Sequence, residues 1–226
     1  MPSPKDTLFE QLARLGKALA APKRVEMLDA LSQGPRTVER LATATGQTVA
    51  NASQHLQVLR QAHLVTSEKQ GLYVTCRLAS DAVGGLLVHI RELGEAQLSE
   101  LQAAREALLS QTEGVESVDR QTLFARLKTS EAVLIDVRPR HEYTAAHLPG
   151  ALSIPLDELA GRLKELKKGQ EIVAYCRGPY CMLSADAVRL LSRRGFRARR
   201  LEEGVLEWRA AGMKTVAGEK PLRRRG

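Results

Sequence analysis

The sequence predicts two folded domains in series, an α+β helix-turn-helix domain with a β-hairpin and an α/β domain with a central parallel sheet. The 226 residues leave room for two ordinary domains. The first half has helical periodicity followed by short alternating segments, and the second half alternates apolar runs with helical stretches. We expect a first domain over 1–110, a linker over 111–117, a second domain over 118–218 and a basic tail over 219–226.

Helices and then a hairpin are expected in the first domain. Thr37 is placed to cap a short helix and Gly46 to end it. After the next helix, Lys69-Gln70-Gly71 has the composition of a hairpin turn. The expected helices cover 22–31, 37–44 and 48–63, and the expected strands cover 64–66 and 72–78. This order is typical of a winged helix-turn-helix, whose second helix enters the major groove of DNA.

A long amphipathic helix is expected from Asp81 to about Ser110. Apolar side chains recur along it at helical spacing, beginning with Val83 and Leu86. The segment 78–110 carries two basic and five acidic residues, so that an acidic helix follows the basic body of the domain. Its apolar stripe is larger than one small domain can cover, which predicts an interface between two copies of the chain.

The run from Ser53 to Val65, SQHLQVLRQAHLV, resembles the recognition helix of the ArsR family of bacterial transcriptional repressors. The resemblance extends over about residues 8–105. It implies a homodimer, joined through its first and last helices, on an inverted-repeat operator in double-stranded DNA. By position it assigns residues to the DNA-facing surface, namely Thr48, Asn51, Ser53, Gln54 and His55, and to phosphate contacts, namely Arg60, Lys69 and Arg77.

No metal site and no cofactor are expected. The metal sensors of the ArsR family carry paired cysteines on the helix before the recognition helix, but here that helix reads TVERLA over 37–42. The last helix offers His89 and a few carboxylates, which are too few soft ligands for zinc or arsenic. Cys76 is alone in this half, and we expect it to be a buried thiol on a wing strand.

Strands and helices alternate after the polar linker. Helices are expected over 119–127, 156–166 and 184–192, and strands over 132–137, 151–154 and 171–175. Cys176 directly follows the last of these strands, at the edge where parallel sheets carry their reactive sites. Its loop leads into a helix whose first N–H groups favour a thiolate, and Arg177 adds a positive charge.

Several separated motifs resemble the rhodanese (single-domain sulfurtransferase) family over about residues 116–215. They are LIDVR at 134–138, HLPGA at 147–151, the strand before Cys176, and LEEGV at 201–205 with Trp208. The resemblance implies that Cys176 accepts a sulfane sulfur from a donor such as thiosulfate or a persulfide and passes it to a thiophilic acceptor. Asp136 and Arg138 would be mainly structural, paired near the active loop, and His147 would make a structural hydrogen bond.

The loop after Cys176 departs from the rhodanese pattern. Eight residues precede Ser184 where the family usually has six, and few of them are polar, which argues against efficient use of thiosulfate. Cys181 lies five positions after Cys176, and the two thiols can join if their Cα atoms come within about 7 Å. We hypothesise that Cys181 resolves a Cys176 persulfide to a disulfide or polysulfide. The alternative is that Cys181 is a small apolar residue at the start of the helix.

Charge and hydropathy bound the class of partner. The net charge of +8, from 34 basic and 26 acidic residues, is compatible with a polyanion. We expect the arginines between Arg193 and Arg200 to form solvated surface. The charged first residues are unlike a signal peptide and no window resembles a membrane span, so we expect no membrane partner and a cytoplasmic location.

These observations predict a DNA-binding transcriptional regulator, a repressor, whose second domain senses or transfers sulfane sulfur through a Cys176 persulfide. Two alternatives stay open. The chain could be primarily a rhodanese-type sulfurtransferase, with the winged helix serving dimerisation or localisation. It could also be an arsenite-responsive repressor that uses Cys176 and Cys181, with Cys76 as a remote candidate ligand.

Overall fold

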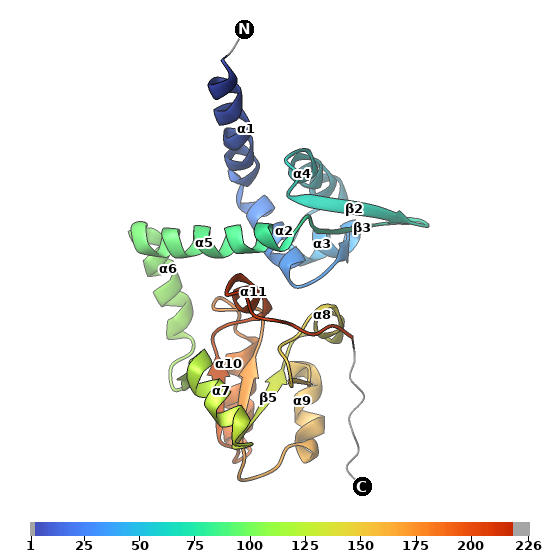
Figure 1. Cartoon of the computed structure of the whole chain (residues 1–226). Helices are drawn as coiled ribbons and strands as arrows, with labels where there is room; N and C mark the ends of the chain where they lie inside the picture. The colour runs from blue at the N-terminus through green and yellow to red at the C-terminus, as the bar shows by residue number, and fades with distance from the viewer. Residues whose placement is uncertain (1–2, 219–226) are drawn as a thin grey trace. The chain divides into compact units, whose positions relative to one another are not determined.

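The computed structural model describes residues 3–218, and the chain divides into two compact units, Met1–Leu87 and Val88–Gly226 (Figure 1). The basic tail expected over 219–226 lies outside the described residues. The second unit begins within a helix, and the domain boundaries expected around 111–117 remain a prediction. No helix within residues 3–218 is long and apolar enough to cross a membrane.

The first unit is a winged helix-turn-helix, as the sequence predicts. Its elements are α1 (Pro4–Leu19), α2 (Pro22–Ser32), β1 (Arg36–Thr37), α3 (Val38–Ala44), α4 (Val49–Gln61), β2 (Val65–Gln70) and β3 (Tyr73–Leu78). Thr37 caps α3 by accepting a hydrogen bond from the N–H of Arg40 at 3.4 Å. In the antiparallel sheet β3 lies between β1 and β2, and fully buried Leu41, Leu56 and Leu59 fix α3 and α4 in the core.

The helix expected as one piece from Asp81 to about Ser110 is in fact two helices, α5 (Asp81–Gln97) and α6 (Ser99–Ser110), so this prediction is wrong. Leu98 between them is extended, with φ −111° and ψ 106°. Across the bend the Leu101 side chain packs onto Gly94, where a Cβ would lie 2.7 Å from Cδ2 of Leu101. The amphipathic pattern continues through the break, which is why periodicity alone did not reveal it.

The second unit contains a five-stranded parallel sheet in the order β4-β8-β7-β5-β6. Its strands are β4 (Ser117–Val118), β5 (Ala132–Asp136), β6 (Leu152–Ser153), β7 (Glu171–Tyr175) and β8 (Ala198–Leu201). Its helices are α7 (Arg120–Lys128), α8 (Arg140–Ala145), α9 (Leu156–Arg162), η1 (Leu163–Glu165), α10 (Leu183–Arg193) and α11 (Val205–Ala210). The alternation of apolar runs and helical stretches thus gave the correct fold class, an α/β domain with a parallel sheet.

Helices cover both faces of this sheet (Figure 1). One buried cluster joins the sheet to α7, α8 and α11 through Leu123, Tyr143 and Trp208. The other joins it to α9 and α10 through Leu159 and Leu191. Coverage on both sides explains why the central strand β7 is buried along its whole length. Cys176 is the first residue after this enclosed strand.

Candidate functional site

The Cys176 thiol lies between the end of β7 and the first turn of α10, and only 1% of the residue is exposed. Its Sγ lies 3.2 Å from Oγ of Ser184, in the first turn of α10, and 3.3 Å from the carbonyl oxygen of Cys181. As a thiol, Cys176 donates to the Cys181 carbonyl oxygen. As a thiolate, it accepts from the Ser184 hydroxyl, so each protonation state has a partner.

Hydrogen bonds make Cys176 the acidic member of the cysteine pair. Burial raises the pKa of Cys176, but hydrogen bonds from the Cys181 thiol and from the hydroxyl and N–H of Ser184 outweigh burial. With a further bond from the N–H of Gly178, they lower this pKa to about 6. The pKa of Cys181 is raised, because its thiol donates to Cys176 and because it is buried. The pair therefore holds one proton near neutral pH, on Cys181, and leaves the Cys176 sulfur nucleophilic.

Arg177 faces a carboxylate. Its Nη2 donates to Oε1 of Glu142 at 2.7 Å and its Nε donates to Oε2 at 2.9 Å, and the Glu142 side chain is 1% exposed. This bond raises the pKa of Arg177. The positive charge expected at the loop is present, but most of it is compensated, and Arg177 anchors the loop to α8. Glu142 belongs to the rhodanese-like motif that begins at Leu134, but nothing in the sequence indicated that it pairs with Arg177.

Asp136 and Arg138 form a fully buried ion pair at the carboxyl end of β5, with Nη2 and Oδ2 2.6 Å apart. Arg138 Nη2 also donates to the carbonyl oxygen of Ala146 at 2.7 Å. The hydroxyl of Tyr175, the residue before Cys176, donates to Asp136 Oδ2 at 2.5 Å and accepts from the N–H of Leu148 at 3.0 Å. This network joins the ends of β5 and β7 and fixes the backbone from which the sulfur loop departs.

Two glycines let the loop pass close to neighbouring groups. A Cβ at Gly204 would lie 2.6 Å from the carbonyl carbon of Arg177 and 2.8 Å from the carbonyl oxygen of Cys176. Gly178 has φ +136°, and a Cβ there would lie 2.9 Å from Oε2 of Glu207. The same oxygen accepts from the N–H of Gly204 at 2.7 Å. The sulfur loop is therefore packed directly against the start of α11.

Charged side chains from α5 contact the loop and α11 within the second unit. The Tyr180 hydroxyl donates to Oε1 of Glu95 at 2.5 Å, and the Arg91 guanidinium lies 5.6 Å from the centroid of the Tyr180 ring. Arg91 Nη2 also donates to Oε1 of Glu207 at 2.8 Å. Burial and the bond to Glu95 raise the pKa of Tyr180 to about 12. The sequence showed this helix only as an acidic, amphipathic segment, and nothing in the pattern pointed to these pairs.

The arginines expected as solvated surface do not all lie there. Arg199 makes ion pairs with Glu116 and Glu171, and Arg200 is buried, with 2% of the residue exposed. Adjacent residues of a strand point to opposite faces, and at this end of β8 the face of Arg200 is fully covered whereas Arg199 stays partly exposed. The prediction of solvated surface is wrong for Arg200.

Most of the residues expected to face DNA are exposed on α4 and its N-cap. They are Thr48, Asn51, Ser53 and Gln54, while His55 is half-buried. Thr48 Oγ1 accepts a hydrogen bond from the N–H of Asn51 at 3.2 Å, and Ser53 Oγ donates to the carbonyl oxygen of Val49 at 2.8 Å. These two hydroxyls have partners on their own helix, which leaves the amides of Asn51 and Gln54 as the better placed groups for base edges.

The three residues expected to contact phosphate are all exposed, but their surroundings differ. Arg60 donates to Oγ of Ser67 at 3.1 Å, and Arg77 pairs with Glu68 at 2.6 Å across the hairpin. Exposed ion pairs contribute little free energy, so a phosphate can displace the Arg77 contact. Lys69 lies near the hairpin turn between β2 and β3.

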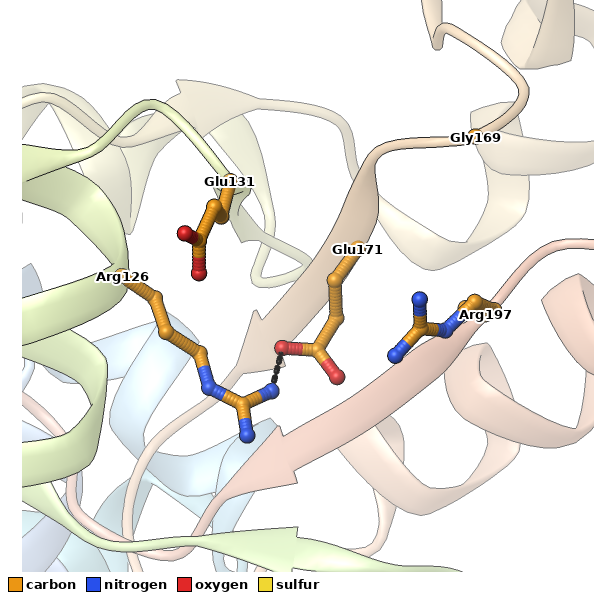
Figure 2. Close-up of a pocket in the computed structure, with 5 residues that line it drawn as sticks. All are labelled: Arg126, Glu131, Gly169, Glu171 and Arg197. Carbon is orange, nitrogen blue, oxygen red and sulfur yellow. Dashed lines mark hydrogen bonds and ion pairs between the residues drawn. The ribbon is translucent and has the colours of Figure 1, made fainter.

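A cavity of about 300 Å³ lies beside the amino end of β7, whereas Cys176 follows the carboxyl end of this strand. Figure 2 shows charged residues around it, with Arg126 and Arg197 on either side of Glu171, and Glu131 and Gly169 nearby. Arg126 hydrogen-bonds to Glu171, the first residue of β7. The positive and negative side chains compensate one another, and we assign this cavity to structure rather than to ligand binding.

Cys76 and His147 have the structural surroundings that the sequence predicts. Cys76 is buried on β3, and burial raises its pKa, so it stays a thiol at neutral pH. The Nδ1 of buried His147 lies 2.9 Å from the carbonyl oxygen of Tyr143. Across residues 3–218, no three His, Cys, Asp or Glu side chains are grouped so that they could hold a metal ion.

Comparison with known proteins matches both halves of the chain. Residues 21–67 match the bacterial regulatory proteins of the arsR family, and residues 119–211 match the rhodanese-like domain. The HTH-type transcriptional regulator Rv0324 of Mycobacterium tuberculosis is 42% identical over 214 residues, which cover 95% of this chain and 94% of that protein. The similarity therefore extends across both domains.

Each half also has relatives of its own. A sulfurtransferase of Allochromatium vinosum is 31% identical over 107 residues, 46% of this chain and 98% of that protein. A solved homodimeric winged helix-turn-helix DNA-binding domain from Mycobacterium bovis is 37% identical and covers 44% of this chain and 93% of its own, with a TM-score of 0.41. On the full-length match, the chain belongs to the transcriptional regulators that join an arsR-family helix-turn-helix domain to a C-terminal rhodanese domain.

Proposed function

We propose that this transcriptional regulator is a homodimeric repressor that senses sulfane sulfur through a persulfide on Cys176, which Cys181 resolves. The observation that carries the proposal is the asymmetry of the thiol pair. The pKa of Cys176 lies near 6 while that of its hydrogen-bonded neighbour Cys181 is raised. An acidic thiol beside a protonated one is the arrangement of a sulfur nucleophile with a resolving cysteine.

The chemistry has two balanced steps. The Cys176 thiolate attacks the outer sulfur of a donor persulfide, R–S–SH, which gives Cys176–S–SH and releases the thiolate R–S⁻. Cys181 then attacks Cys176 Sγ as it loses its proton, the bond between Sγ and the outer sulfur breaks, and the outer sulfur leaves as HS⁻ and takes up that proton, which gives a Cys176–Cys181 disulfide and H₂S. In the second step the sulfane sulfur is reduced to sulfide and the two protein thiols are oxidised.

Formation of the disulfide would change contacts that reach α5. Tyr180 precedes Cys181 in the loop and is bonded to Glu95, and Glu207 packs on Gly178 and is bonded to Arg91. A covalent Cys176–Cys181 bond draws together the two ends of the segment that contains Tyr180. Because α5 is one continuous helix from Asp81 to Gln97, a shift at Glu95 or Arg91 would reach the winged helix-turn-helix through this helix.

Dimerisation is supported by apolar side chains left exposed on two elements. Leu8, Phe9 and Leu12 on α1 are each more than half exposed, and Leu93 on α5 is 64% exposed. Exposed apolar stripes of this size mark interaction surfaces. We expect Leu12→Glu and Leu93→Glu to shift the protein toward monomer in sedimentation velocity, while Leu72→Glu, at the exposed hairpin tip, leaves the distribution unchanged.

The test combines mass and DNA binding on the full chain. An operator is first selected from random double-stranded DNA, and the protein is then treated with inorganic polysulfide. We expect Cys181→Ser to gain about 32 Da per added sulfur and to hold it, and the unsubstituted protein to proceed to a disulfide. Cys176→Ser should gain no sulfur and keep its operator affinity. Equal affinity of untreated, treated and Cys176→Ser protein would refute sensing.

A second candidate is a sulfurtransferase for which DNA binding is secondary. The observation that favours it is the acidic Cys176 itself, which suits transfer as well as sensing. Steady release of thiocyanate from thiosulfate and cyanide, with no selection of a preferred DNA sequence, would support this function. The enclosed sulfur and the eight-residue loop lead us to expect slow turnover with thiosulfate.

A further inference from the structure

Arg200 lies directly beneath the sulfur loop. In the parallel sheet its Cα is paired with that of Ala174 in β7, two residues before Cys176. Residues paired across a sheet point to the same face, and Ala174 and Cys176 belong to the same buried cluster on one side of the sheet. The side chains of Arg200, Ala174 and Cys176 therefore point to one face of the sheet, the face covered by α9 and α10.

The charge of Arg200 is buried without a counter-charge. Its Nη2 donates to the carbonyl oxygen of Pro179 in the loop at 3.3 Å, and its Nε has no hydrogen-bond partner among residues 3–218. Nor does any carboxylate of the described chain lie within 4 Å of its guanidinium. The neighbouring Arg199 lies on the other face and pairs with Glu116 and Glu171. Burying an unpaired guanidinium is costly, so its retention needs a compensating role.

Resting on the proposed function of Cys176, we infer that Arg200 is the positioning residue that holds the sulfur loop and supplies the buried positive charge for the anionic sulfur, as thiolate and as persulfide. Arg177 is less suited to this role because Glu142 compensates its charge. The contact with Pro179 also fixes the orientation of the peptide group between Pro179 and Tyr180. In a trans peptide the C=O and N–H point in opposite directions, so anchoring the Pro179 carbonyl turns the Tyr180 N–H away from the guanidinium.

Two substitutions separate the charge of Arg200 from its hydrogen bond. Arg200→Gln keeps a donor for the Pro179 carbonyl oxygen but removes the charge, and Arg200→Lys keeps the charge. Arg199→Gln is the matched control, because it removes an arginine whose charge carboxylates compensate. The measurement is the pH dependence of iodoacetamide alkylation at Cys176, read by peptide mass spectrometry, together with the melting temperature of each full-length variant.

In Arg200→Gln we expect the alkylation midpoint to rise by about one pH unit, with alkylation at pH 6 slowed severalfold. Melting temperature should stay unchanged or rise, since an unpaired buried charge is removed. Arg200→Lys should keep the midpoint of the unsubstituted protein. Arg199→Gln should keep the midpoint and melt at a lower temperature.

An unchanged midpoint in a folded Arg200→Gln protein overturns the inference, and so does a raised midpoint in Arg200→Lys equal to that in Arg200→Gln. Should Arg200→Gln fail to fold, the role is structural and the inference is also overturned. Alkylation requires neither a sulfur donor nor DNA. If polysulfide leaves operator affinity unchanged while the Arg200→Gln midpoint rises, the sensing function fails and the role of Arg200 stands.

Discussion

Replacing Ser184 with alanine tests how much of the acidity of Cys176 comes from one hydroxyl. Ser184 Oγ lies 3.2 Å from the sulfur, and its hydrogen bond is among the causes that lower the Cys176 pKa to about 6. A hydrogen bond to a charged group contributes about 1.5–3 kcal/mol, and a diffuse sulfur acceptor takes the low end. Since one pKa unit corresponds to about 1.4 kcal/mol, Ser184→Ala should raise the Cys176 pKa by about one unit.

The assay is the rate of iodoacetamide alkylation at Cys176 between pH 5 and pH 10. At pH 6 the thiolate fraction should fall from about a half to about a tenth, so alkylation should slow about fivefold, whereas the rates at pH 9 should converge. Ser192→Ala removes an exposed hydroxyl from the same helix and serves as the control. A folded Ser184→Ala protein with an unshifted profile would show that backbone N–H groups and Cys181 suffice, and the reasoning on the hydroxyl would be wrong.

Three further predictions concern stability. Arg138→Met leaves the buried carboxylate of Asp136 without its ion-pair partner and should lower the free energy of unfolding in urea by about 3–5 kcal/mol. Arg140→Met, which breaks an exposed pair, should lower it by less than about 1 kcal/mol. Gly204→Ala should cost about 1–3 kcal/mol, because its Cβ meets loop backbone at 2.6 Å; wild-type stability would contradict the packing described. The Cys176 thiol keeps its proton up to its ordinary pKa near 9 in the unfolded chain, whereas in the folded protein it releases the proton near 6. The stability advantage of the unsubstituted protein over Cys176→Ser should therefore grow from pH 6 to pH 9 and vanish as the pH falls through 6. Equal urea midpoints of the two proteins across this range would refute the lowered pKa.

Local sequence signals predicted the elements and the position of the sulfur loop. Apolar periodicity and caps such as Thr37 specify α3 and α4, and the strand over Glu171–Tyr175 was predicted with the bounds that the structure has. These features depend on residues close in sequence, which is why one chain suffices to find them. The break at Leu98 was missed because the amphipathic pattern continues through the one extended residue between the two helices, and periodicity does not report such a residue.

The partners of the site residues depend on long-range packing, and the sequence could not supply them. Arg177 was expected to add charge to the loop, but whether that charge is free depends on Glu142, 35 positions earlier. Arg200 stood in an arginine-rich run that is usually solvent-exposed, and only the pairing of β8 inside a sheet covered on both faces buries it. Composition gives the number of charges, whereas the fold decides which of them are compensated.

The hydrogen bond from Cys181 to Cys176 connects the chemistry of the loop to its shape. While Cys181 is a thiol, it donates to the Cys176 sulfur and helps to keep that sulfur anionic. Once the two sulfurs are joined, the donor is lost and the sulfur carries no charge, so Arg200 no longer has an anion to face. The loop then loses the attraction between the anionic sulfur and Arg200, while the new covalent bond draws Cys181 toward Cys176. Tyr180 is the neighbour of Cys181 and its hydroxyl donates to Glu95, so we expect oxidation of the pair to alter that hydrogen bond at the end of α5.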